Sequence, residues 1–497
     1  MEAIRQWWQA SNAKQDHHDD DTIYPLHMLD DTRTLHSIVV AWTLRFDDVL
    51  DPEKLKDALS KLLEIGDWRK LGGRLRLKED GSLELHSPNI YTAERPAFAY
   101  SQVEVATAID EDPLARQLPK AAKSPSIQKG PELFQKFAAR EDAPRTIDDF
   151  LRNDTPVLSL HITPFSDATL VAISWPHILM DVMGQQALVR NWSRVLAGEQ
   201  SQVAPLLGAR DDVLSIAAEA EDPNPEPFLV ARQKLTGLGM LSFGSRMAWD
   251  VFWNTAETRS IFLSATAVSG LQERSRDELA KMRPGERPHL ISINDILTAW
   301  MARIVSSSLP QPRPLTVLHA INTRFRLGTK LDRDDSGVYV QNMALASFTF
   351  LPAAALTAPI GIIADQNRTQ FSMQSSEGQI LAYLREVRSQ PKGSRDPSTL
   401  CGPSDAVLMP FTNWDKADFF NAIDFSPAVV QRDEASGIQN TAAGTISYHH
   451  ASSMQPNPMM RNVVIIYGKD RGGNYWLTGT FVPRIWSKIE EAVKELS

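Results

Sequence analysis

Apolar residues recur with a helical period in two well-marked stretches of the chain. In residues 50–66 four leucines share one helical face, which predicts an amphipathic helix. Residues 291–309 carry a second apolar stripe, and Ser292 with Asp295 three residues later has the spacing of a capping box. Each stretch therefore predicts a helix that buries one face. A closing helix is expected after residue 482.

Apolar and polar residues alternate in other stretches, which is the period of a half-buried strand. Residues 72–86 alternate on both sides of Asp80 and Gly81, a pair that favours a tight hairpin turn. Further strand patterns occupy residues 315–325, 343–351, 462–468 and 475–482. Because strands and helices interleave along the chain, we expect an α/β fold.

The length and one composition shift predict how this fold is divided. A chain of 497 residues is too long for one ordinary core. Residues 218–228 (AEAEDPNPEPF) are rich in proline and acid, as in a connecting segment. We therefore predict an N-terminal domain over residues 1–204, a crossover over residues 205–258 and a C-terminal domain over residues 259–497.

Charge and cysteine content exclude several classes of protein. Acidic residues outnumber basic ones by 61 to 52, and the formal charge of -9 disfavours binding to a phosphate backbone, so no nucleic-acid partner is expected. Cys401 is the only cysteine, so no intrachain disulfide and no cysteine-based metal site can form. No secretory signal or membrane span stands out. We expect a cytoplasmic monomer without a membrane partner.

One histidine and one aspartate stand four residues apart in SWPHILMDVMG (174–184). A strand pattern ends at Pro176, and a helical pattern begins at Asp181, so His177 is expected at a strand exit and Asp181 at a helix N-terminus. Two interpretations are open at this point. The pair is either a buried histidine followed by a helix cap, or a general base whose loop is held in place.

Further motifs in the same chain order decide how this pair is interpreted. The sequence resembles the BAHD acyltransferases, in particular the fungal secondary-metabolism members of the trichothecene- and hydroxycinnamoyl-transferase-like branch. The central HxxxD motif of that family is matched by His177 and Asp181. The other similar segments are YPLHMLDD (24–31), GGRL (72–75), SINDILTAW (292–300), AINTRFRL (320–327), GVYVQNMAL (337–345) and TNWDKADFFNAIDFSPA (412–428).

Two positions depart from the family pattern. Val182 replaces the glycine that directly follows the motif aspartate, although Gly184 comes two residues later. Residues 424–427 (DFSP) replace the family's DFGWG and lose its glycine. Since that loop is remote from the chemistry in the family, the second departure affects the local fold more than catalysis.

The resemblance implies a two-domain chloramphenicol-acetyltransferase-like fold with a channel between the domains. His177 would act as general base on an acceptor hydroxyl or amine, which would then attack the thioester of an acyl-CoA co-substrate. Thr412, Asn413 and Trp414 match the segment that stabilises the oxyanion, and Asp181 would pair with Arg324 to lock the loop. The acceptor would be a small secondary metabolite, and its binding residues are unknown.

The sequence offers no other site, and two alternatives stay open. No metal or redox cofactor is expected, because the chain has no P-loop, HExxH, GxSxG or GxGxxG motif. The run DHHDDD (16–21) is interpreted as a solvated loop rather than a metal site. The alternatives keep the fold: a carrier-protein-bound acyl donor, as in condensation domains, or a derived cyclisation, condensation or binding role.

Overall fold

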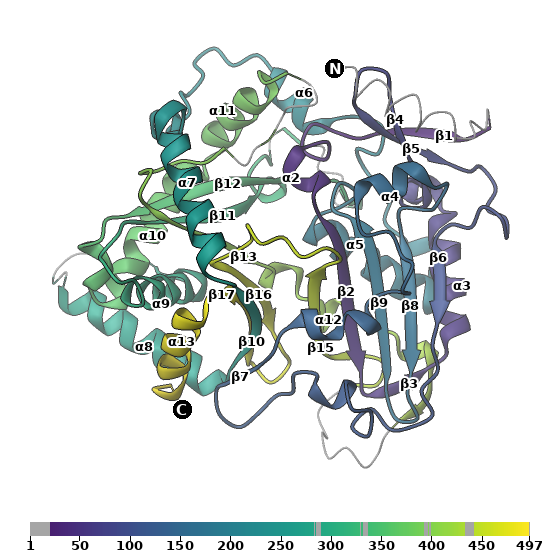
Figure 1. Cartoon of the computed structure of the whole chain (residues 1–497). Coiled ribbons are helices and arrows are strands. Elements are labelled where there is room, and N and C mark those ends of the chain that lie inside the picture. Colours follow the sequence, from purple (N-terminus) through teal and green to yellow (C-terminus); the bar gives the residue numbers. More distant parts are fainter. Residues whose placement is uncertain are drawn as a thin grey trace.

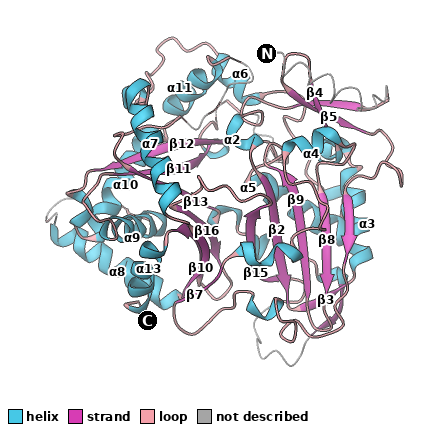
Figure 2. Cartoon of the chain, in the orientation of Figure 1, coloured by secondary structure: helices cyan, strands magenta, loops and turns pink. Residues whose placement is uncertain are grey.

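The computed structural model describes residues 20–496 except 283, 285–289, 329, 332–335, 392–395, 397–398 and 433–441. Two large β-sheets lie side by side, each covered by helices (Figures 1 and 2). The architecture is therefore α/β with two layered halves, as the sequence predicts.

The first half is built on a five-stranded sheet with the order β15-β2-β9-β8-β6. Its strands are β2 (Val39–Phe46), β6 (Ala99–Gln102), β8 (Ser159–Pro164), β9 (Thr169–Pro176) and β15 (Ile446–Ser453). Two helices pack together behind it, α3 (Pro52–Leu63) and α5 (Val182–Leu196). The indole N–H of Trp192 on α5 donates to the Leu55 carbonyl of α3 at 3.0 Å. The four leucines of the predicted apolar face of α3 are all buried.

The second half is built on a seven-stranded sheet with the order β12-β11-β13-β16-β17-β10-β7. Its strands are β7 (Ser126–Lys129), β10 (Glu257–Leu263), β11 (Leu315–Asn322), β12 (Ala344–Leu351), β13 (Val407–Asn413), β16 (Val463–Lys469) and β17 (Tyr475–Phe481). Its helices are α8 (Ala265–Met282), α9 (Ile293–Ser307), α10 (Ile360–Gln374) and α13 (Pro483–Lys494). Helix α9 starts with the predicted capping box of Ser292 and Asp295.

Smaller elements complete the fold. The predicted hairpin forms β4 (Arg74–Leu77) and β5 (Leu83–Ser87), with β1 (Thr22–Pro25) beside β5. A two-stranded sheet joins β3 (Asp48–Leu50) to β14 (Val429–Arg432). Short helices are α2 (Arg33–His36), α4 (Ile147–Arg152) and α12 (Phe419–Ala422), and α11 (Glu377–Arg388) packs on α6 (Val213–Glu219).

The two halves exchange strands across the predicted domain ranges. Strand β7 comes from the range 1–204 but pairs with β10 in the second sheet. Strand β15 comes from the range 259–497 but pairs with β2 in the first sheet. Neither contiguous range is therefore a closed unit, because edge pairing depends on distant partners that a local pattern does not specify.

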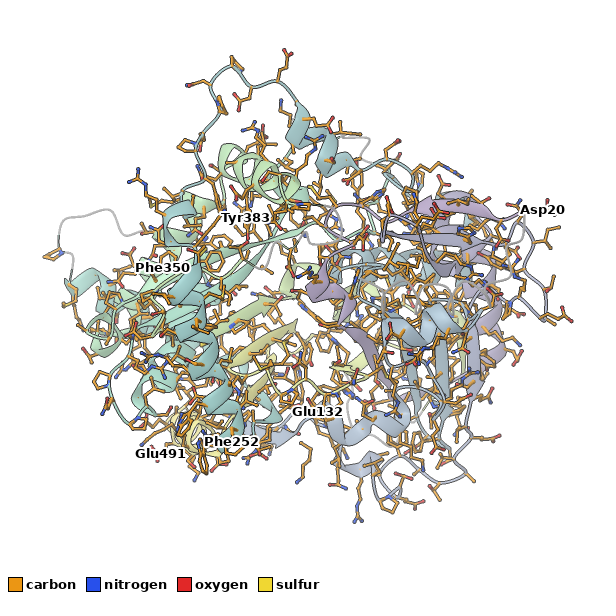
Figure 3. All side chains as sticks on the ribbon, turned by 45° about the horizontal axis from the view of Figure 1, so that its top comes forward. Asp20, Glu132, Phe252, Phe350, Tyr383 and Glu491 are labelled. Atoms are coloured by element: carbon orange, nitrogen blue, oxygen red, sulfur yellow. The ribbon has the colours of Figure 1, made fainter. Side chains whose placement is uncertain are left out.

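The predicted crossover, residues 205–258, also contains helices. Besides α6 it forms α7 (Gly237–Trp253), which runs across the front of the second sheet in Figure 1. None of the residues of α7 is buried, and Phe252 is 75% exposed (labelled in Figure 3). Among the described residues, no helix is long and apolar enough to span a bilayer.

Candidate active site

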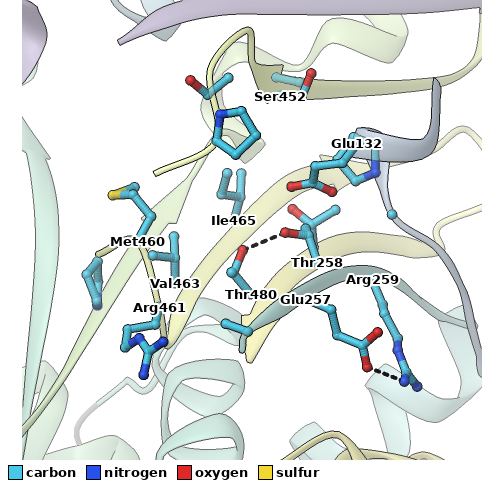
Figure 4. A pocket seen from close by; sticks show the side chains of 18 of the residues that line it. Glu132, Glu257, Thr258, Arg259, Ser452, Met460, Arg461, Val463, Ile465 and Thr480 are labelled. Atoms are coloured by element: carbon cyan, nitrogen blue, oxygen red, sulfur yellow. Dashed lines mark hydrogen bonds and ion pairs between the residues drawn. The ribbon is translucent and has the colours of Figure 1, made fainter. Parts of the chain in front are cut away.

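A cavity of about 1900 Å³ lies where the two sheets meet. Its wall takes residues from β2 and β15 of the first sheet and from β7, β10, β11, β13, β16 and β17 of the second. Figure 4 shows part of this wall, where the hydroxyls of Thr258 on β10 and Thr480 on β17 hydrogen-bond at 2.9 Å. The predicted channel between two halves is thus present as a cavity with contributions from both.

His177 lies on this wall, directly after β9 ends at Pro176. Its backbone N–H donates to the Ile38 carbonyl at 2.9 Å, and its own carbonyl accepts from the Asn342 amide at 2.9 Å. Burial lowers the pKa of the imidazole below its ordinary value, while the nearby carboxylates of Asp181 and Asp30 act in the opposite direction. The ring is therefore neutral at pH 7, which is the form that can accept a proton.

Asp181 combines both roles that the sequence left open. One carboxylate oxygen caps α5 by accepting from the N–H groups of Met183 and Gly184, each at 3.1 Å. Both oxygens also pair with the Arg324 guanidinium, at 2.7 and 3.0 Å. The two side chains are only 9% and 10% exposed, so this is a buried bidentate ion pair. Arg324, the partner that the family resemblance implies for Asp181, is thus the residue that contacts it.

Residues 339–343, the clamp segment, hold this arrangement from the second half of the chain. Arg324 donates to the carbonyls of Tyr339 (3.1 Å) and Gln341 (2.5 Å), and the Met343 N–H donates to Asp181 at 2.9 Å. The segment also explains the glycine at 184. A Cβ there would lie 2.2 Å from the Val340 carbonyl oxygen, so only glycine lets α5 approach the clamp segment.

Thr412 and Trp414 lie on the cavity wall at the end of β13, but Asn413 does not line it. The Asn413 amide donates to the Asn294 side chain at 2.8 Å, and its oxygen accepts from the Asp415 N–H at 2.7 Å. These bonds tie the end of β13 to α9. Asn413 therefore does not face the cavity with Thr412 and Trp414, since alternate residues of a strand point to opposite faces.

The second departure from the family pattern lies away from the cavity. Within residues 424–427, Phe425 is buried and packs between Phe46 (5.3 Å between ring centroids) and Trp192 (4.7 Å). None of residues 424–427 lines the cavity. The loop is structural here, as expected.

The sole cysteine and the run 16–21 lie outside the site or outside the described residues. Cys401 is buried, and burial raises the pKa of its thiol to about 11, so it is not an activated nucleophile. Of the run 16–21, only Asp20 and Asp21 are described, and Asp21 pairs with Arg95 at 2.7 Å. Among described residues, no group of three or more His, Cys, Asp or Glu side chains is arranged to hold a metal ion.

Sequence reasoning missed two residues beside His177. Asn342 contacts the His177 carbonyl, and Asp30 in turn accepts from Asn342. Both lie inside segments that carry the family resemblance, 24–31 and 337–345, but those segments carried no assigned role. Their shared position became visible only in three dimensions.

Two sheets share one cavity, with the His177 imidazole at a strand exit and the buried Asp181–Arg324 pair behind it, as in a two-domain chloramphenicol-acetyltransferase-like fold. The model of the Transferase family matches residues 134–413, more than half of the chain. The chain therefore belongs to the Transferase family of BAHD acyltransferases and is an acyltransferase.

Individual relatives agree with this assignment. The chain is 34% identical to O-acetyltransferase PaAT-2 of Phomopsis amygdali over 96% of this chain and 98% of that protein. It is 33% identical to acetyltransferase pyiB of Pyricularia grisea, with 96% and 94% covered. Among solved structures, F. graminearum TRI101 complexed with coenzyme A and T-2 mycotoxin has a TM-score of 0.67 at 13% identity, covering 95% of this chain and 97% of that one.

Proposed function

We propose that the chain transfers an acyl group from an acyl-CoA to a hydroxyl group of a small secondary metabolite, with His177 as general base. The observation that carries the proposal is a neutral imidazole on the wall of a cavity built by both halves. At about 1900 Å³ the cavity exceeds the roughly 300–1,000 Å³ typical of single-ligand pockets, so a donor and an acceptor fit together.

In the proposed reaction, His177 removes the proton from the acceptor hydroxyl as its oxygen attacks the thioester carbonyl. A tetrahedral oxyanion forms. The C–S bond then breaks, and the imidazolium returns its proton to the leaving thiolate of CoA. The products are an ester and free CoA, and no co-reactant is consumed.

Thr412 and Trp414 are proposed to stabilise the oxyanion. The Thr412 hydroxyl and the Trp414 indole N–H are both donors, and both residues line the cavity. Trp414 is fixed by an edge contact with Tyr467 (5.3 Å between ring centroids) and by its backbone N–H, which donates to the Ile466 carbonyl at 2.9 Å. A hydrogen-bond donor that is held this rigidly needs little reorganisation during the reaction.

Acetyl-CoA is the proposed first donor, and a hydroxyl the proposed acceptor group. The support is three relatives that cover almost the whole chain and are named O-acetyltransferase PaAT-2, acetyltransferase pyiB and acetyltransferase BOT5. The structural neighbour complexed with coenzyme A and T-2 mycotoxin has the same fold and binds two small molecules together. The apolar wall residues Ile38, Leu318 and Ile465 favour an acceptor with a hydrocarbon skeleton.

The test measures thiol release from acetyl-CoA by the purified protein in the presence of a metabolite extract. His177→Ala should keep the fold but lose about 10²–10⁴ in turnover. His161→Ala is the matched control, because His161 is buried on the adjacent strand β8 and does not line the cavity. A folded, fully active His177→Ala protein would end this proposal. Activity only with an acyl group on a carrier protein would favour the condensation-type alternative.

A further inference from the structure

The backbone of His177 is held from both sides by bonds that come from distant parts of the chain. Its N–H donates to the Ile38 carbonyl at the start of β2, and its carbonyl accepts from the Asn342 side chain, 2.9 Å in each case. Pro176 precedes it and restricts the chain further. With both peptide groups fixed, the direction of the Cα–Cβ bond that carries the imidazole is fixed as well.

The Asn342 side chain is itself held in one orientation by Asp30. The Asp30 Oδ1 atom accepts from the backbone N–H of Asn342 at 2.7 Å and from its side-chain amide at 2.9 Å. Both partners of the Asn342 Nδ2 atom, the Asp30 carboxylate and the His177 carbonyl, are acceptors. An amide group can meet two acceptors only with its nitrogen, so the orientation of the side chain is determined.

Asp30 is completely buried, and the surrounding residues keep its carboxylate in place. Its second oxygen accepts from the His27 N–H at 3.2 Å. Lys70 is also buried, 1% exposed, and its ammonium is an opposite charge that acts on Asp30. Burial raises the pKa of Asp30, whereas Lys70 acts in the opposite direction. Burying a carboxylate costs free energy of desolvation, and this cost is large for a group that only stabilises the 27–31 turn. A further role for Asp30, through Asn342, is therefore expected.

We infer that Asn342, oriented by Asp30, is a positioning residue that fixes the His177 backbone so that the imidazole faces the cavity. The inference rests on the proposed function of His177 and adds two residues to the machinery that supports it. Asp181 and Arg324 hold the far end of the same turn, so residues 177–181 are fixed at both ends from the second half of the chain.

The experiment compares Asn342→Ala with Asn367→Ala. Both asparagines are buried, 5% and 1% exposed, and each donates its Nδ2 to a buried aspartate, Asp30 at 2.9 Å or Asp295 at 3.0 Å. Asn367 lies on α10 behind the second sheet and does not line the cavity. Loss of a buried amide that donates to an aspartate is therefore matched. Asn367 also bonds to Thr349 and His319 through its side-chain oxygen, and none of these bonds involves His177.

For Asn342→Ala we expect kcat to fall by about 10²-fold with little change in KM for acetyl-CoA, since a small misplacement of a reacting group has that effect. The acid limb of kcat/KM should also move to lower pH, because the Asn342 side chain raises the pKa of His177 and is lost, whereas Asp181 and Asp30, which also raise it, stay in place. Asn367→Ala should keep the wild-type kcat and acid limb, whatever it does to stability.

Two results would overturn the inference. One is a folded Asn342→Ala protein with wild-type kcat. The other is an equal loss of kcat in both alanine variants with the acid limb unmoved. If Asn342→Ala does not fold, Asn342→Leu decides in the same way, because it fills a similar space and has no side-chain N–H to donate to the His177 carbonyl. His177→Ala is measured in parallel. A fully active His177→Ala protein refutes the proposed function. An inactive His177→Ala protein together with a fully active Asn342→Ala protein refutes only the positioning role of Asn342.

Discussion

The Asp181–Arg324 pair gives two substitutions with unequal predicted effects on stability. Arg324→Ala removes the ion pair but leaves Asp181 with three backbone N–H donors at 2.9–3.1 Å. Asp181→Ala removes those bonds too and leaves a guanidinium that is only 10% exposed without its carboxylate. Breaking a buried pair costs about 3–5 kcal/mol, so we place Arg324→Ala near the lower end of that range. Asp181→Ala should cost about 1 kcal/mol more for the lost cap of α5.

The double variant tests whether these two side chains act as a pair. Residues that share a buried interaction show coupling of about 0.5–3 kcal/mol, so the combined substitution should cost less than the sum of the single ones. Lys488→Ala is the control. Lys488 and Glu491 form an exposed pair on α13 at 2.7 Å, 44% and 61% exposed, which is worth at most about 1 kcal/mol.

Urea unfolding followed by tryptophan fluorescence measures these differences, with the activity recorded on the same samples. The reasoning requires Asp181→Ala to be the least stable single variant and the double variant to be less than additive. Strict additivity, or an Arg324→Ala protein no less stable than Lys488→Ala, would show that the pair is not the clamp described here.

Three other predictions follow from separate parts of the structure. Burial lowers the pKa of both His449 and His450 to about 3, against about 6.5 in the unfolded chain. Both are thus neutral in the fold. Below about pH 6.5 the unfolded chain binds more protons than the fold, so the free energy of unfolding should fall by about 4 kcal/mol between pH 7 and pH 5. A urea midpoint that does not fall would contradict this. Gly184→Ala should destabilise the protein, since its Cβ would lie 2.2 Å from a backbone carbonyl oxygen, whereas Gly270→Ala on α8, with open space around it, should stabilise by up to about 1 kcal/mol; equal melting temperatures would refute the contrast. Thr412→Val should lower kcat by about 10²–10³ if the hydroxyl serves the oxyanion, and an unchanged kcat would remove it from the mechanism.

The local elements could be predicted from the sequence because their signals lie within a few residues of each other. The leucines of α3, the capping box of α9 and the turn at Gly81 each depend on neighbours at most four residues away, and all three are found as predicted. The same holds for His177 at a strand exit and Asp181 at a helix N-terminus. The resemblance to a family added Arg324, whose pairing no local pattern indicates.

Tertiary structure alone decided which distant groups meet. It exchanged β7 and β15 between the two halves, turned Asn413 towards α9, and brought Asp30 and Asn342 together behind His177. These outcomes depend on strand pairing and on the burial of charged groups, which are settled by contacts between residues more than a hundred positions apart. Periodicity specifies which face of an element is buried, but it does not specify what that face is buried against.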